Sequence, residues 1–123
     1  MDVSPFTAEG VYLIKGYGPG FIQVNQDRHD CSLIVGPGVL QTWALEPDAP
    51  LDRAALEPIV EMAPEMVLIG TGSAIRHLDP QVRQWLREVG IRVELVDTPN
   101  ACRTYNFLVQ EGRSFLAALV VLP

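Results

Sequence analysis

The sequence predicts an α/β fold: a single three-layer domain on a mixed β-sheet, with a β-rich N-terminal half and a parallel β-α-β-α-β C-terminal half. Two observations predict this architecture. Short apolar runs separated by Gly/Pro turns fill the first 45 residues, a pattern typical of hairpins or a meander. Beyond residue 50, apolar runs alternate with segments of helical periodicity, an order that implies crossover connections and a largely parallel sheet.

Four short strands are predicted in the N-terminal half, over residues 11–14, 21–24, 31–35 and 39–45. The turns Gly18-Pro19-Gly20 and Gly36-Pro37-Gly38 separate some of these runs, and the polar residues 25–30 predict another turn. Trp43, in the last run, is interpreted as a core residue, and His29, in the polar turn, as a solvated side chain.

A helix over about residues 53–62 follows, because Asp52 can cap it and apolar residues recur at helical spacing. Pro58 is awkward inside this helix, where it would kink the chain or mark the true start. The apolar run 66–69 is too short for a helix and lies between Pro64 and Gly70, so we expect a buried strand.

Two further helices have strong start signals. Asp79-Pro80 and Thr98-Pro99 each place a capping residue before a proline, whose missing N–H costs nothing in the first helical turn. These helices are expected to end at Gly90 and near residue 110. Strands over residues 91–96 and 114–122 complete the predicted order.

Composition excludes several classes of function. The chain of 123 residues is of single-domain size, so residues 1–123 are expected to form one domain. A net charge of −6, with one lysine and scattered arginines, argues against nucleic acid and an anionic membrane surface as partners. No signal peptide or apolar run long enough to insert in a membrane is recognisable, so a cytoplasmic location is expected.

The two cysteines, Cys31 and Cys102, are far apart and form no zinc-ligand pattern. We therefore expect no metal and no cofactor, and a monomer or small homo-oligomer.

The C-terminal half carries a recognisable set of motifs. They are Pro64–Gly72, Gly90–Glu94, Asp97-Thr98, Ala101–Asn106, Glu111–Arg113 and Ala117–Leu119. In these the chain resembles a domain-of-unknown-function family of small bacterial and archaeal proteins, which also includes mitochondrial complex I assembly factor 3 and an adipogenesis-associated protein. The resemblance covers nearly the whole chain. It implies a three-layer α/β fold around a mixed sheet and, for the mitochondrial branch, an accessory or assembly role.

The loop Gly70-Thr71-Gly72 is the first candidate ligand site, because it follows a buried strand and its glycines could let backbone N–H groups approach an anion. The alternative is a tight turn that needs glycine torsions. A dinucleotide site is disfavoured because Ile75 replaces the third glycine of the usual fingerprint.

Cys102, Arg103 and Asn106 form the second candidate set, on one helix. The early helical position and the neighbouring arginine could favour a thiolate at Cys102. The favoured interpretation is that Cys102 is buried and packs as a small apolar side chain. Arg103 and Asn106 either line a cleft with Thr71 or fix the helix to nearby loops, Arg103 for instance to Asp97 or Glu65. No catalytic residue is assigned.

Three functions follow from these candidates. A non-enzymatic accessory or assembly module that binds a protein partner is favoured, in line with the family resemblance. A small-molecule or anion-binding protein using residues 70–72 is the alternative. A cysteine-dependent enzyme is the least favoured, since no nucleophile–base pair is recognisable.

Overall fold

The computed structural model describes residues 11–112 and 115–123. Its larger sheet has five strands in the order β5-β4-β8-β6-β7. The strands are β4 (Leu33–Gly36), β5 (Val39–Thr42), β6 (Met66–Gly70), β7 (Arg92–Val96) and β8 (Leu116–Leu119). β6 pairs in parallel with both β7 and β8, whereas β4 pairs antiparallel with β5 and β8. The predicted mixed sheet and its parallel β-α-β-α-β half are therefore confirmed.

A second, three-stranded antiparallel sheet is formed by β1 (Ile14–Gly18), β2 (Phe21–Val24) and β3 (Asp27–His29). β3 lies where the sequence predicted only a polar turn, and that prediction is wrong. The reversal takes just two residues, because Asn25 adopts a positive φ of 52° and Asp27 then pairs with Val24. His29, expected to be solvated, is half-buried beside Ile22 in this sheet.

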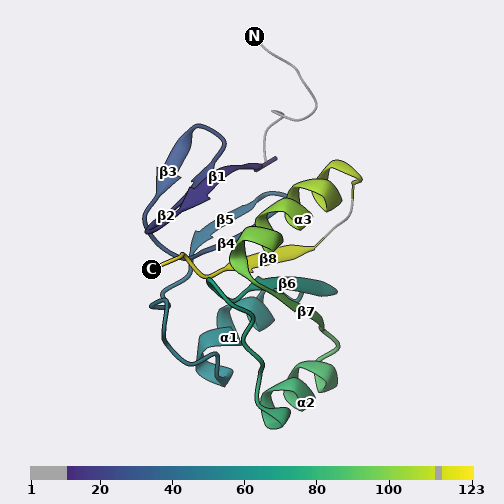
Figure 1. Ribbon diagram of the computed structural model, residues 1–123. Helices are drawn as coiled ribbons and strands as arrows, with labels where there is room; N and C mark the ends of the chain where they lie inside the picture. Colours follow the sequence, from purple (N-terminus) through teal and green to yellow (C-terminus); the bar gives the residue numbers. More distant parts are fainter. Residues whose placement is uncertain (1–10, 113–114) are drawn as a thin grey trace.

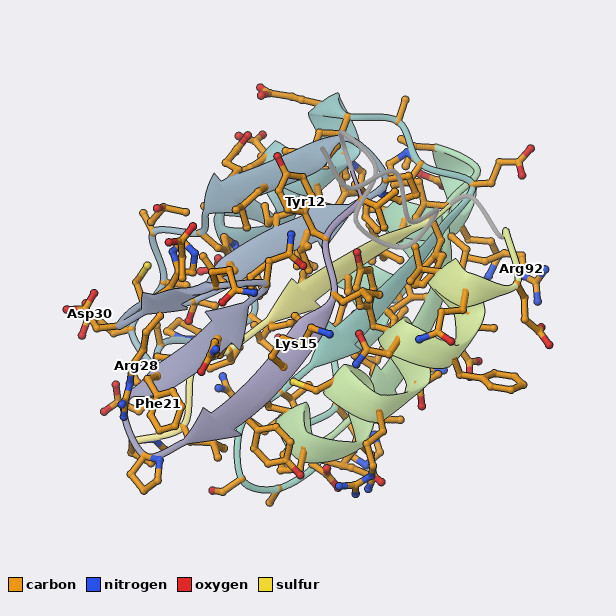
Figure 2. All side chains as sticks on the ribbon, turned by 90° about the horizontal axis from the view of Figure 1, so that it is seen from above. Tyr12, Lys15, Phe21, Arg28, Asp30 and Arg92 are labelled. Carbon is orange, nitrogen blue, oxygen red and sulfur yellow. The ribbon has the colours of Figure 1, made fainter. Side chains whose placement is uncertain are left out.

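Three helices complete the layers: α1 (Arg53–Glu61), α2 (Pro80–Glu88) and α3 (Thr98–Gln110). α1 and α2 cover one face of the large sheet, while α3 and the small sheet lie on the other (Figure 1). Each face has its own apolar core, and the two cores are separated by the sheet. Seen from above, the small sheet lies beside α3, with Arg28 over the ring of Phe21 at 3.6 Å (Figure 2).

The helices start at the predicted residues, with a correction at α3. Asp79 is the N-cap of α2, but its side chain makes no capping hydrogen bond. Asp52 accepts a hydrogen bond from the Ala55 N–H at 3.0 Å, as an N-cap does. The cap of α3 is Asp97, not Thr98: its carboxylate accepts the Asn100 N–H at 2.8 Å. Thr98 is instead the first helical residue. Its side chain is fully buried, and its hydroxyl donates to the Val120 carbonyl.

Strand ends were predicted less well than strand cores. β1 spans Ile14–Gly18 rather than the predicted 11–14. β5, the fourth predicted strand, ends at Thr42 rather than at residue 45. The last spans Leu116–Leu119, and Ser114, its predicted start, lies outside the described residues. Trp43 is 2% exposed, which confirms it as a core residue, and its ring N–H donates to the Ala55 carbonyl at 2.9 Å.

Within the described part of the chain, none of the helices has both the length and the apolar character needed to span a bilayer.

Candidate functional site

The loop after β6 borders an open hollow of about 580 Å³ at the carboxyl ends of the parallel strands. Its lining comprises Pro47, Asp48, Thr71, Gly72, Ser73, Ala74, Arg76 and Pro123. Two members of the first candidate set, Thr71 and Gly72, therefore reach the hollow. The third, Gly70, lies behind them against α3, where a Cβ atom would come within 2.9 Å of the Thr98 Cα and the Ala101 Cβ.

The backbone N–H groups of this loop bond within the chain. The Thr71 N–H donates to the Val96 carbonyl at 2.8 Å, and the Gly72 N–H donates to the Thr98 hydroxyl at 2.9 Å. The Thr98 N–H returns a bond to the Gly72 carbonyl at 2.8 Å. Gly72 has a φ of +108°, a conformation that side chains resist. In this geometry the Thr71 N–H holds the loop to the end of β7, and the Gly72 N–H holds it to the start of α3.

The side chains that line the hollow also form their hydrogen bonds with backbone groups of this chain. The Thr71 hydroxyl donates toward the Ala74 carbonyl at 2.7 Å and accepts the Arg76 N–H at 3.0 Å. The Arg76 guanidinium donates to the carbonyls of Pro47, at 3.1 Å, and Ala49. Arg76 thus ties the loop after β6 to the segment before α1.

Arg103 and Asn106, farther along α3 than Thr98, bond to the small sheet rather than to the loop. Asn106 accepts the Ile14 N–H at 2.8 Å and donates its amide to the Ile14 carbonyl at 2.7 Å. Arg103 donates to the Tyr17 hydroxyl and to the Asn100 side-chain oxygen, both at 2.7 Å. The suggested Arg103 bonds to Asp97 or Glu65 are therefore replaced by these two. The structure brings Arg103 and Asn106 together along β1.

Asp97 has a lowered pKa. The main cause is the hydrogen bonding of its carboxylate to the backbone and side chain of Asn100, and the Arg103 charge adds to it. These contacts belong to the cap of α3.

Cys102 is 2% exposed and packs in the core between α3 and the small sheet. Burial raises the pKa of its thiol from 9.0 to about 12, and the Arg103 charge only partly opposes this. A reactive thiolate needs the opposite shift.

We expect Cys102 to resist alkylation in the native protein. At pH 8, a pKa of about 12 leaves a thiolate population roughly 1000-fold smaller than a pKa of 9.0 does. Timed iodoacetamide labelling of a Cys31→Ser variant isolates Cys102, and Cys102→Ser isolates the half-buried Cys31 for comparison. Labelling of Cys102 within minutes at pH 7 without denaturant would contradict the interpretation that its thiol is buried and unreactive.

No group of three or more His, Cys, Asp or Glu side chains that could hold a metal ion occurs in residues 11–112 and 115–123.

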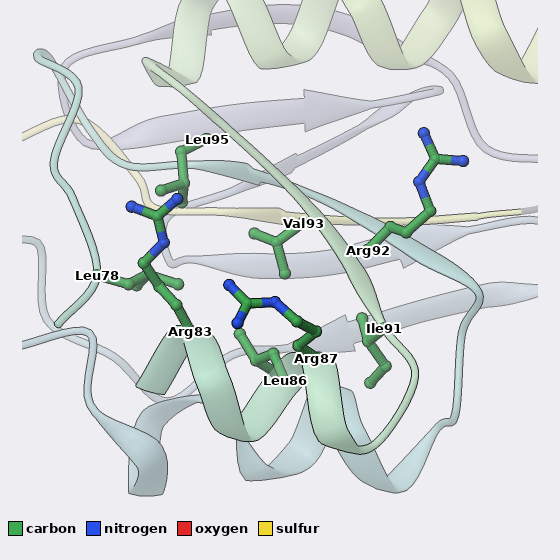
Figure 3. A pocket seen from close by; sticks show the side chains of 8 residues that line it. All are labelled: Leu78, Arg83, Leu86, Arg87, Ile91, Arg92, Val93 and Leu95. Atoms are coloured by element: carbon green, nitrogen blue, oxygen red, sulfur yellow. The ribbon is translucent and has the colours of Figure 1, made fainter. Parts of the chain in front are cut away.

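A second hollow, of about 300 Å³, lies between α2 and β7 and was missed by the sequence reasoning. Its lining residues are Leu78, Arg83, Leu86, Arg87, Ile91, Arg92, Val93 and Leu95 (Figure 3). The available sequence signal was Arg83 and Arg87, which are four residues apart and so share one face of a helix.

The family model that matches this chain spans residues 14–120, from β1 to just beyond β8, and describes a protein of unknown function (DUF498/DUF598). The chain belongs to this family. The resemblance inferred from the motifs of the C-terminal half is thereby confirmed.

Relatives in the DUF498/DUF598 family come from distant organisms. The human NADH dehydrogenase (ubiquinone) 1 alpha subcomplex assembly factor 3 is 38% identical over 94% of this chain, which spans 64% of that protein's length. An uncharacterised protein of Rhodobacter capsulatus is 32% identical, over 93% of this chain and 88% of its own. A crystal structure from Bordetella parapertussis has a TM-score of 0.82 at 34% identity, covering 93% of this chain and 98% of that one.

Proposed function

We propose that the protein is a non-enzymatic accessory module that binds another protein during the assembly of a larger complex, and that it works in the cytoplasm. The observation that carries the proposal is the similarity, over 94% of this chain, to a human protein named as an assembly factor. Because this chain spans less than two thirds of that relative, the role is proposed for the shared domain.

The geometry of the candidate residues supports binding rather than chemistry. Thr71, Thr98 and Asn106 use their polar groups on the backbone of their own chain. Cys102 is buried with a raised pKa. Enzymes usually hold such groups free to meet a substrate and shift their pKa values toward the working pH.

A small-molecule or anion ligand at Gly70-Thr71-Gly72 is the second candidate. The hollow of about 580 Å³ beside Thr71 and Gly72 favours it, since ligand sites in open α/β sheets lie at the carboxyl ends of the strands.

Affinity capture with chemical cross-linking from the cell of origin tests the proposal, with native mass spectrometry of the same material. We expect one protein retained in a fixed ratio to the chain, which itself is a monomer or small homo-oligomer. A bound small molecule with no protein partner would instead support the hollow beside residues 70–72.

A further inference from the structure

Among residues 11–112 and 115–123, β7 is an edge strand of the large sheet and pairs with β6 alone. The Arg92 N–H donates to the Glu65 carbonyl at 3.0 Å, and the Val96 carbonyl accepts the Thr71 N–H at 2.8 Å. Backbone groups alternate in direction along a strand, as the side chains do. The residues at even-numbered positions of β7 therefore direct their N–H and C=O groups toward β6.

Val93 and Leu95 then direct their N–H and C=O groups away from β6, to the open edge. Within the described residues no hydrogen bond engages these groups. At the β1 edge, by contrast, the Asn106 side chain occupies the N–H and C=O of Ile14, much as a neighbouring strand would. An uncovered strand edge can accept a further strand. Of the β1 and β7 edges, β7 is therefore the one whose outward backbone groups can pair with an added strand.

The floor of the groove beside this edge is apolar and its rim is basic. Leu78 and Leu86 are buried in the hollow between α2 and β7, and Val93 and Leu95 are half-buried there. Arg83 and Arg87 are exposed side chains of α2 that also line it. In Figure 3, Arg83 reaches toward Leu95 and Arg87 extends below Val93. Within residues 11–112 and 115–123, the side-chain hydrogen bond formed along α2 joins Gln84 to Glu88 and does not use these arginines.

The spacing of these arginines suits an extended chain. Residues four apart on a helix have Cβ atoms about 5–6 Å apart, and alternate residues of a strand lie roughly 6.6 Å apart. Two acidic residues at positions i and i+2 of an added strand would therefore meet Arg83 and Arg87 together. Glu94 would not oppose them, because it alternates with Val93 and Leu95 and so stands on the other face of β7.

We propose that an extended acidic segment of the partner protein adds to β7 as a sixth strand and places alternate carboxylates on Arg83 and Arg87. The main-chain bonds to Val93 and Leu95 supply affinity, and the arginine pair selects the sequence, as in other cases of strand addition. This inference rests on the proposed protein-binding function and names its site and the chemistry of its partner.

A synthetic peptide tests the site without knowledge of the partner. The probe is a fluorescein-labelled seven-residue peptide in which Glu alternates with Val, and its Gln counterpart is the neutral control. We expect the Glu peptide alone to raise fluorescence anisotropy and to shift the amide NMR signals of Val93 and Leu95. The double variant Arg83→Gln/Arg87→Gln should weaken binding at least about tenfold. Lys15→Gln/Arg28→Gln, which makes the same charge change on the small sheet, should not.

N-methylation of the peptide separates strand addition from charge attraction alone. Blocking one alternate set of peptide amides should abolish binding while blocking the other set leaves it intact. The inference is overturned if the Glu and Gln peptides bind equally well, or if neither set of N-methyl groups changes peptide binding. It is also overturned if this chain forms a dimer through β7. If affinity capture retains a partner that the Arg83→Gln/Arg87→Gln variant holds equally well, this site is wrong and the protein-binding function stands. If no partner is captured, the proposed function itself fails.

Discussion

Replacing Thr98 with valine is expected to lower the free energy of unfolding by about 2–4 kcal/mol. The Thr98 side chain is fully buried, and its hydroxyl donates to the Val120 carbonyl at 2.6 Å while accepting the Gly72 N–H at 2.9 Å. Valine has nearly the same shape, so it fills the space but leaves both backbone groups without a partner. A buried donor or acceptor that loses its partner costs roughly 1–3 kcal/mol. Urea unfolding followed by circular dichroism measures the change.

Thr98→Ser is the matched control, because it keeps the hydroxyl and removes only a methyl group. It should cost about 1 kcal/mol or less, a value typical of one buried methyl group. The comparison also bears on the loop of residues 70–72. If Thr98→Val unfolds at the same urea concentration as the parent protein, Thr98 does not hold the loop, and the Gly72 N–H is available to a ligand.

The parts of the fold that local chemistry determines could be predicted from the sequence. Asp79-Pro80 marks the start of α2, and the apolar run 66–69 marks β6, because the effects of proline and of apolar burial act over a few residues. Even the error at the start of α3 is small: Asp97 and Thr98 are both good capping residues, and only the buried contacts of Thr98 exclude it from the cap.

Features that depend on distant residues could not be predicted. The polar segment 27–29 has no strand pattern of its own and becomes β3 through pairing with β2. The role of Asn106 is set by Ile14, 92 residues earlier in the chain. Likewise, the motif containing Cys102 and Arg103 does not reveal that its polar groups turn toward β1 rather than toward Thr71.

The arginine groove shows the same limit. Arg83 and Arg87 share a helix face by their spacing alone, but such a pair is usually a solvated surface. What singles it out is the strand order, which leaves β7 at the edge. Strand order in a mixed sheet depends on long-range pairing, here on the insertion of β8 between β4 and β6.

Replacing Tyr105 with alanine is expected to lower the free energy of unfolding by about 3–5 kcal/mol, the range for removing a large buried aromatic side chain. Tyr105 is fully buried in the core between α3 and the small sheet, and its ring packs against Phe115 with centroids 5.6 Å apart. Its hydroxyl donates to the carbonyl of Tyr12, just before β1. The side chain therefore joins α3 to both sheets, and its loss leaves a cavity among all three.

Tyr105→Phe separates the ring from the hydroxyl. It keeps the packing against Phe115 and leaves only the Tyr12 carbonyl without its donor, so we expect a loss of about 1–2 kcal/mol. Amide hydrogen exchange should show where the stability goes. In Tyr105→Ala the amides of β1 and β2 should exchange faster relative to those of β6, because the small sheet is held to α3 by this side chain and by Asn106. A uniform rise in exchange across both sheets would mean that the small sheet unfolds only together with the rest of the molecule.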